Sequence, residues 1–286
     1  MSIGIKSEIN PIRLVVTHSP GIEHEFVTPA NLEPSINTCG KSIDNPDYLL
    51  FDDLIYVPEA KSEHNQLKNI LHHFTDGNCY ELIDILNVVI DDNKVKEALL
   101  KECANLEKEL YNNIIDTKPL LSCTNDVFIE VLLSGYLDDA HIFTYPLPNL
   151  IFPRDIAVCF GKTILITWAK KHVRRRENII SKYIFTHSKL FKDLNVFDFH
   201  SNFPELSIEG GDILILDDKR VCIGISERTP LESVASLAPI FYKEGFEKII
   251  AIDMPKKRSL MHLDTIFTKI SNEEVLVYPP ILEKKL

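Results

Sequence analysis

Residues 212–225 read DILILDDKRVCIGI, and this stretch decides the fold class. Two apolar runs flank the polar turn at 217–219, a pattern that predicts a β-hairpin. A helix is expected over about residues 230–243, and an apolar strand follows over 249–252. Strand, strand, helix and strand in this order predict an α/β fold.

The same order of elements occurs earlier in the chain. A hairpin is predicted over residues 156–167, and a helix follows around 177–183. Both copies open with Asp-Ile, at Asp155 and Asp212, and both place an arginine before the helix. The two copies suggest pseudo-symmetric β-β-α modules, whose loops gather at one end and form a site.

Residues 61–136 have a different character, with helical spacing of the apolar residues and almost no glycine. Two predicted amphipathic faces are formed by Leu67, Ile70, Leu71 and Phe74, and by Val95, Leu99, Leu100, Cys103, Leu106 and Leu110. We expect an all-helical subdomain here. It follows a β-rich run at residues 13–18 and a run of similar character at 49–58.

Composition excludes several classes of protein. The chain has 286 residues with 31 Lys+Arg against 42 Asp+Glu, a net charge of −11, which disfavours binding to nucleic acid or an anionic membrane. The six cysteines form no C-x-x-C pair, and neither a signal peptide nor a membrane-spanning run is present. We therefore expect a soluble, reduced, cytoplasmic protein whose cysteines pack as small hydrophobic residues.

Four polar clusters stand at the ends of the predicted strands, and each allows more than one interpretation. They are residues 148–155, 209–212, 224–230 and 261–265. The first fits a surface turn. The second, Glu-Gly-Gly-Asp, fits either a tight turn with solvated acids or a buried carboxylate, since paired glycines permit positive φ and close backbone approach.

The third and fourth clusters contain the arginine and the histidine. Ser226 or Thr229 is a candidate helix cap, but capping does not explain Arg228 beside a helix N-terminus, which indicates an anion site. His262 and Asp264 would share one face of a strand, as a surface pair or as two metal ligands.

Taken together, the clusters supply carboxylates, one histidine and separated arginines. Carboxylates bind a guanidinium group bidentately, and arginines bind a carboxylate in the same way, so this set would hold free arginine at both ends. A metal site built from the aspartates, the glutamate and the histidine is the alternative.

The motifs, in this order, closely resemble arginine deiminase of the guanidine-modifying, or amidinotransferase, superfamily. The resemblance covers essentially the whole chain. Its motifs are RLVVTHSPG at residues 13–21, LFDD at 50–53, PNLIFPRD at 148–155, EGGD at 209–212, GISER at 224–228 and MHLDTIF at 261–267.

The resemblance implies a pseudo-fivefold α/β-propeller of ββαβ modules, incomplete at the C-terminus, with an inserted helical subdomain. Residues 1–60 would form the first module, 61–140 the helical insertion, and 141–286 further modules, the last one truncated. It implies no cofactor and no metal.

The resemblance also implies roles for residues. Asp155 and Asp264 would hold the guanidinium nitrogens, while Glu209 and His262 would form the acid/base pair. The residues expected at the amino-acid end of the substrate are Arg174, Arg228, Asn149 and the backbone of Leu50.

The family's reaction converts L-arginine to L-citrulline and ammonia through a covalent thiouronium on a cysteine. That cysteine lies in a last module, and no cysteine follows Asp264 in this sequence. The candidate functions are an arginine deiminase completed by the missing C-terminal segment, a non-catalytic arginine-binding protein, and a related reaction on another guanidine. The expected partners are L-arginine and either a second chain that supplies the missing module or further copies of this chain in a homo-oligomer.

Overall fold

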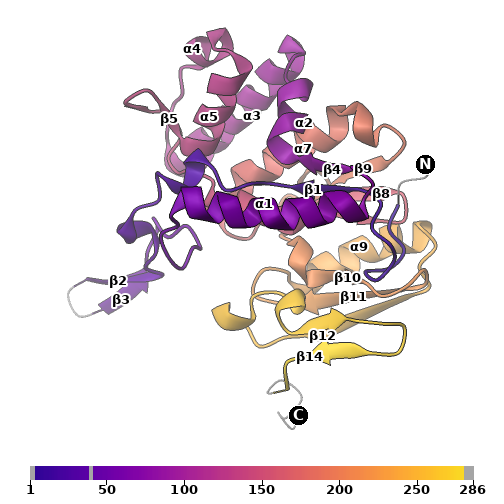
Figure 1. Cartoon of the computed structure of the whole chain (residues 1–286). Helices are drawn as coiled ribbons and strands as arrows, with labels where there is room; N and C mark the ends of the chain where they lie inside the picture. Colours follow the sequence, from indigo (N-terminus) through magenta and orange to yellow (C-terminus); the bar gives the residue numbers. More distant parts are fainter. Residues whose placement is uncertain (1–3, 39–40, 280–286) are drawn as a thin grey trace. The chain divides into compact units, whose positions relative to one another are not determined.

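The computed structural model describes residues 4–38 and 41–279 (Figure 1). These residues form two compact units. Unit 1 comprises residues 4–12, 154–171 and 189–279, and unit 2 comprises residues 13–38, 41–153 and 172–188.

Unit 1 contains two three-stranded sheets with the same topology. In one, β7 (Ala157–Phe160) pairs antiparallel with β8 (Thr163–Ile166), and β8 pairs in parallel with β9 (Asn195–Asp198). In the other, β10 (Ile213–Ile215) pairs antiparallel with β11 (Arg220–Ile225), and β11 pairs in parallel with β12 (Lys248–Asp253). Both predicted hairpins, and their repetition, are confirmed.

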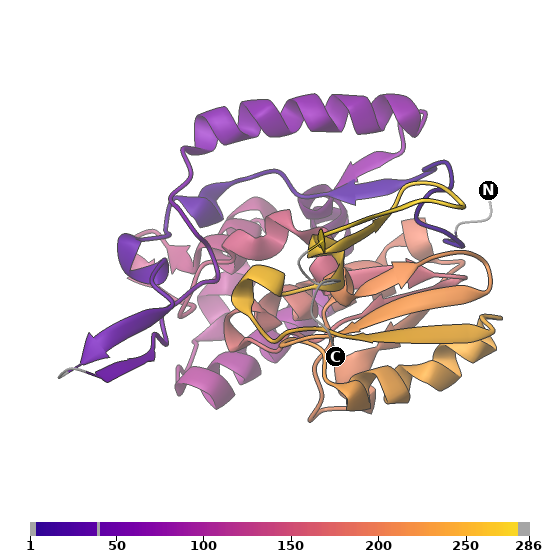
Figure 2. The same cartoon turned by 90° about the horizontal axis from the view of Figure 1, so that it is seen from below.

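Helix α9 (Leu231–Lys243) covers one face of the second sheet and contacts β11 and β12 (Figure 2). Its Phe241 ring lies 4.2 Å from that of Phe160. An apolar cluster formed by Leu214, Cys222, Met254, Leu263 and Ile266 packs beside the same strands. Burial of these strands explains why residues 213–216 and 221–225 are continuous apolar runs rather than alternating ones.

The remaining elements of unit 1 are short. Strands β13 (Phe267–Lys269) and β14 (Val275–Val277) form an antiparallel hairpin. The helical segments are α8 (Phe199–Asn202), η5 (Lys189–Phe191), η6 (Gly210–Asp212), η7 (Arg258–Leu260) and η8 (Leu263–Thr265). Helix α6 (Pro153–Ile156) spans the point in the sequence where unit 2 gives way to unit 1.

Unit 2 is mainly helical. Its α-helices are α1 (Val57–Phe74), α2 (Leu82–Val89), α3 (Asn93–Tyr111), α4 (Thr117–Ser122), α5 (Asn125–Ser134) and α7 (Arg175–His187). The strands are β1 (Val15–Thr17) in parallel with β4 (Cys79–Glu81), and the hairpins β2 (Ser35–Thr38) with β3 (Lys41–Asp44) and β5 (Tyr136–Leu137) with β6 (Ala140–His141). The 3-10 turns are η1 (Ile22–His24), η2 (Pro29–Asn31), η3 (Pro148–Ile151) and η4 (His172–Arg174).

The core of unit 2 lies where α2, α3, α5 and α7 pack together (Figure 1). The predicted face of α3 from Val95 to Leu106 is buried there, as expected. The face predicted on α1 is not, because Leu67, Ile70 and Phe74 are all more than half exposed.

Two predictions of secondary structure are wrong in unit 2. Strand β4 lies inside the segment expected to be all-helical, where its parallel pairing with β1 outweighs the local helical tendency. Residues 49–56 form no strand, although their composition resembles that of residues 13–18. Instead Leu50 adopts the left-handed region, with φ at 63°, which a regular strand cannot accommodate.

Candidate functional site

A cluster of carboxylates surrounds His262 in unit 1. The Nε2 atom of His262 lies 3.4 Å from Glu209 Oε2 and 3.7 Å from Asp155 Oδ1. On the other side of the ring, Nδ1 lies 3.6 Å from Asp212 Oδ2. His262 and Glu209 are buried. Three of the residues predicted for catalysis and guanidinium binding are therefore brought together around one imidazole.

The surrounding charge determines the protonation of His262. Burial alone would lower the pKa of the imidazole, but a hydrogen bond with Asp212 and the charges of Asp155 and Glu209 outweigh it. The pKa of His262 rises to about 9. The residue is therefore protonated at neutral pH and able to donate a proton.

Asp264 belongs to the same cluster. Partial burial and the charges of Asp155 and Asp212 raise its pKa to about 6, against the opposing charges of His262 and Arg154. The residue itself keeps substantial solvent exposure, so solvent screens these interactions. The prediction that His262 and Asp264 share one face of a strand is wrong. Instead His262 precedes the 3-10 turn η8, which contains Asp264.

Asp212 also belongs to this cluster, although no catalytic or binding role was predicted for it. It is completely buried and accepts three hydrogen bonds, from Ser226 Oγ at 2.7 Å, Thr229 Oγ1 at 2.6 Å and the backbone N–H of Leu263 at 3.1 Å. These donors stabilise the buried carboxylate that faces His262 Nδ1. Of the two interpretations of residues 209–212, the buried carboxylate is the one observed.

The hydroxyls of Ser226 and Thr229 therefore do not cap the following helix. The residue at the N-cap of α9 is Pro230, and no side chain accepts a hydrogen bond there. Both hydroxyls instead donate to Asp212 from the loop after β11. The interpretation of these residues as helix caps is wrong, because both precede Pro230, the N-cap of α9, and Ser226 Oγ accepts the backbone N–H groups of Arg228 and Thr229 inside the loop instead.

The paired glycines allow close packing rather than positive φ. Neither Gly210 nor Gly211 adopts the left-handed region. A Cβ atom on Gly210 would lie 1.9 Å from the backbone oxygen of Arg154, and one on Gly211 would lie 2.8 Å from His262 Cγ. Glycine is required at both positions because backbone and imidazole pass directly against the turn.

Arg228 is buried next to Glu209. Its Nη1 lies 3.5 Å from Glu209 Oε1, and its Nε has no hydrogen-bond partner among the described residues. Glu209 Oε1 also accepts from the backbone N–H of Lys170 at 3.1 Å, whereas Oε2 accepts no hydrogen bond from the described residues. Both side chains retain hydrogen-bonding capacity.

The other residues predicted at the amino-acid end lie together in unit 2. Asn149 Nδ2 donates to the carbonyl of Leu49 at 2.6 Å, and Arg174 Nη2 donates to the carbonyl of Asn149 at 3.0 Å. Arg174 also forms an ion pair with Glu177 at 2.9 Å. Asn149 and Arg174 are buried, and Leu50 follows Leu49 with its strained backbone. The predicted set therefore falls into two groups, one in each unit.

Three of the described cysteines, Cys103, Cys159 and Cys222, are poorly suited to act as a nucleophile. Burial raises the pKa of Cys159 and Cys222 to about 11 and that of Cys103 to about 12, so the thiolate is scarce at neutral pH. Cys159 and Cys222 lie in strands, as expected of packing residues. Cys39 lies outside the described residues.

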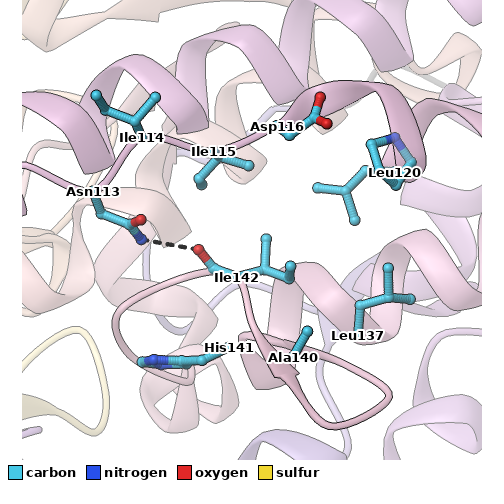
Figure 3. A pocket seen from close by; sticks show the side chains of 10 residues that line it. Asn113, Ile114, Ile115, Asp116, Leu120, Leu137, Ala140, His141 and Ile142 are labelled. Atoms are coloured by element: carbon cyan, nitrogen blue, oxygen red, sulfur yellow. Dashed lines mark hydrogen bonds between the residues drawn. The ribbon is translucent and has the colours of Figure 1, made fainter.

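A separate pocket of about 270 Å³ occurs in unit 2 (Figure 3). It is mainly apolar, with Ile114, Ile115, Leu120 and Leu137 among its lining residues. It contains none of the predicted site residues. Throughout the part of the chain that the structure describes, no group of three or more His, Cys, Asp or Glu side chains is arranged to hold a metal ion.

Comparison with known proteins identifies the family. The family model described as arginine deiminase matches residues 130–286. Arginine deiminase of Limosilactobacillus reuteri is 31% identical over 300 residues, covering 98% of this chain and 70% of the relative. The Latilactobacillus sakei protein of the same name is 32% identical over 303 residues, with the same coverage. The chain belongs to the arginine deiminase family.

The arginine deiminase family consists of hydrolases that act on a guanidino group, and this chain is a member of that class. Among solved structures, it is similar to DDAH from Pseudomonas aeruginosa complexed with citrulline, with 22% identity over 48% of this chain and 49% of that chain and a TM-score of 0.39. The N-terminal domain of the cyanobacterial arginine dihydrolase ArgZ is 20% identical over 47% of this chain and 45% of that chain, with the same TM-score. Across residues 4–38 and 41–279, none of the helices has the length and apolar composition needed to cross a membrane.

Proposed function

We propose that this chain provides the arginine-recognition and acid/base parts of a site that converts L-arginine to L-citrulline and ammonia. The observation that supports this most directly is the grouping of Glu209, Asp155 and Asp212 around His262. Membership of the arginine deiminase family supports the same reaction.

Guanidinium recognition is assigned to Asp155 and Asp264. A planar guanidinium offers pairs of N–H donors that match the two oxygens of a carboxylate. A bound guanidinium would also supply positive charge, which offsets the repulsion between the two carboxylates and lowers the raised pKa of Asp264.

Acid/base transfer is assigned to His262 and Glu209. Attack of a thiolate sulfur on the guanidinium carbon forms a C–S bond, and the C–N bond to the departing ammonia then breaks. A protonated His262 supplies the proton to that nitrogen, consistent with its pKa of about 9. The neutral imidazole then accepts a proton from water, which attacks the thiouronium carbon and releases citrulline and the thiolate.

The thiol is assigned to a residue other than Cys103, Cys159 and Cys222, because burial keeps these three protonated. A homologous C-terminal segment, or a second chain of different sequence, is the source we propose. Assembly as a homo-oligomer is a separate proposal, because another copy of this chain carries the same cysteines. The alternative is a non-catalytic arginine-binding protein. The high pKa values of Cys103, Cys159 and Cys222 among the described residues favour this alternative.

The amino-acid end of arginine is assigned to Arg174, Arg228, Asn149 and the backbone of Leu50. The Nε of Arg228, which has no hydrogen-bond partner within residues 4–38 and 41–279, supports carboxylate binding. We propose that the ββαβ modules belong to a propeller of five, with residues 1–60 in the first module, 61–140 as the helical insertion and 141–286 in further modules. We also propose that the protein is cytoplasmic.

Citrulline formation tests the reaction. The purified chain is incubated with saturating L-arginine, alone and with the C-terminal segment of a homologous arginine deiminase, and His262→Ala is the control. Turnover that needs the added segment and is lost in His262→Ala supports the reaction. Arginine binding without turnover under either condition supports the non-catalytic alternative. Methylated arginine as a competing substrate distinguishes a related guanidine reaction.

A further inference from the structure

A second cluster of charged side chains lies in unit 2, outside the site described above. The carboxylate of Glu23 is completely buried in η1. Its Oε1 lies 3.1 Å from His18 Nε2 and 3.1 Å from His24 Nδ1, and it accepts the backbone N–H of Gly21 at 2.9 Å. We call His18, Glu23 and His24 the η1 cluster.

The η1 cluster is buried and is not fully hydrogen-bonded. Burial alone would raise the pKa of Glu23, but hydrogen bonds and charge interactions with His18 and His24 lower it to about 2. Glu23 Oε2, His18 Nδ1 and His24 Nε2 are buried without a hydrogen-bond partner among the described residues. Burying a carboxylate and two imidazoles is costly, so this cluster needs a structural or functional explanation.

The η1 cluster contacts the segment that contains Leu50. The ring of His24 meets that of Phe51 edge to face, with centroids 5.5 Å apart. On the other side of Leu50, both backbone polar groups of Leu49 form hydrogen bonds. Its carbonyl accepts from Asn149 and its N–H donates to Asn31 O at 2.9 Å.

Leu50 lies between these two anchors with φ at 63°. A bulky residue in this region costs about 1–2 kcal/mol, and such a conformation persists only where its surroundings impose it. Asn149 holds the segment from one side and His24 from the other. The aromatic contact holds His24 against Phe51. Its Nδ1 lies 3.1 Å from Glu23 Oε1 and accepts the backbone N–H of Gly21 at 3.3 Å, so both groups orient the ring.

We propose that the η1 cluster is a positioning device: Glu23 orients His24, which holds Phe51 and thereby keeps the backbone of Leu50 in the strained conformation that faces the amino-acid end of arginine. The positioning step rests on geometry within unit 2 alone. Its link to arginine rests on the proposed function, which assigns the Leu50 backbone to the substrate.

Hydrogen–deuterium exchange tests the positioning step without any ligand. Glu23→Gln removes the charge at nearly constant volume, and Glu25→Gln is the matched control, because Glu25 is an exposed glutamate of the same turn. Phe51→Leu removes the aromatic contact and keeps the buried ion pairs, so it covers the case in which Glu23→Gln does not fold. Exchange over residues 49–54 is expected to rise in Glu23→Gln and Phe51→Leu only. Unchanged exchange in folded variants overturns the positioning step.

Calorimetric binding of two ligands tests the link to arginine. L-arginine carries both ends of the substrate, whereas n-butylguanidine carries only the guanidinium. Glu23→Gln or Phe51→Leu is expected to weaken the binding of L-arginine by about tenfold, the equivalent of releasing strain of about 1.4 kcal/mol. The affinity for n-butylguanidine should stay within twofold of that of the unmodified chain. Equal weakening of both ligands, or of neither, overturns the link. If the unmodified chain binds neither ligand, the proposed function and the link fail together, while exchange over residues 49–54 still decides the positioning step.

Discussion

The pH dependence of stability provides a quantitative test of the His262 cluster. The folded-state pKa of His262 is about 9, against 6.5 for an ordinary histidine. A group whose pKa is raised on folding stabilises the protein below its unfolded pKa, and this contribution is lost as pH rises through the folded pKa. Stability should therefore fall between pH 6.5 and about 9.

The size of the effect follows from the shift. One pKa unit corresponds to about 1.4 kcal/mol, so the full contribution of His262 is about 3 kcal/mol. When titration of His262 in both the folded and the unfolded state is included, its stabilising contribution is about 3 kcal/mol at pH 6.5 and about 1 kcal/mol at pH 8.5. The expected loss across this window is about 2 kcal/mol. The window ends below pH 9, where unfolded cysteines lose their protons, and starts above the pKa of about 6 of Asp264.

Urea unfolding followed by tryptophan fluorescence measures this loss. Trp168 is the sole tryptophan of the sequence and is buried in unit 1, the unit that contains His262. The comparison is with His262→Asn, whose unfolding free energy should change by less than about 1 kcal/mol across the same window. Equal losses in the two proteins would refute the assignment of the raised pKa to His262.

Three further predictions concern the surroundings of this cluster and the η1 cluster. Gly210→Ala should destabilise unit 1 by about 2–3 kcal/mol, because its Cβ would lie 1.9 Å from a backbone oxygen. The control Gly245→Ala adds only backbone strain at φ +97° and should cost about 1 kcal/mol. The midpoints of urea unfolding measure both costs, and equal costs would contradict the close packing of Gly210. Thr229→Val should destabilise the protein by about 1–3 kcal/mol, because it removes a hydrogen-bond donor from buried Asp212. In a double-mutant cycle, Thr229→Val should cost less in the Ser226→Ala background than in the unmodified chain, since both hydroxyls donate to the same carboxylate; strictly additive costs would argue against this sharing. Because the pKa of Glu23 is lowered to about 2, Glu23 contributes about 3 kcal/mol to the free energy of unfolding above pH 4.5, and this stabilisation is lost as pH falls towards 2. Glu23→Gln should lack this pH-dependent stabilisation, and an acid-unfolding transition identical to that of the unmodified chain would contradict the assignment.

Long apolar patterns were predictable from the sequence. The hairpins at residues 157–166 and 213–225, the helix at 231–243 and the buried face of α3 follow from spacing and turn residues alone. Strand β4 was not predictable, because it is three residues long and forms through pairing with β1, distant in the sequence.

The site was predictable as a set of residues but not as an arrangement. Motifs identified Glu209, His262 and Asp155, which the structure groups around one imidazole. The position of Asp212 depends on three donors from two separate loops, and no local pattern reports them. The two glycines before it were the available signal, since close packing of the turn requires them.

The strained backbone of Leu50 illustrates the same limit. An LFDD motif marks the segment, but local preference gives an apolar residue no reason to adopt a positive φ. The conformation depends on two residues that are distant from Leu50 in the sequence. Asn149 donates to the carbonyl of Leu49, and His24 contacts the ring of Phe51. Tertiary contacts of this kind can be identified only once the fold is known.

Calorimetric titration of the chain with L-arginine tests the central claim most directly, with Asp155→Asn as the site variant and Asp253→Asn as the control, since Asp253 is an exposed aspartate of β12. The unmodified chain and Asp253→Asn should bind L-arginine equally. Asp155→Asn should bind it at least about tenfold more weakly, because it lacks one charged hydrogen-bonding partner. Absence of binding by the folded chain, or binding that Asp155→Asn leaves unchanged, would contradict the claim that this carboxylate cluster recognises arginine.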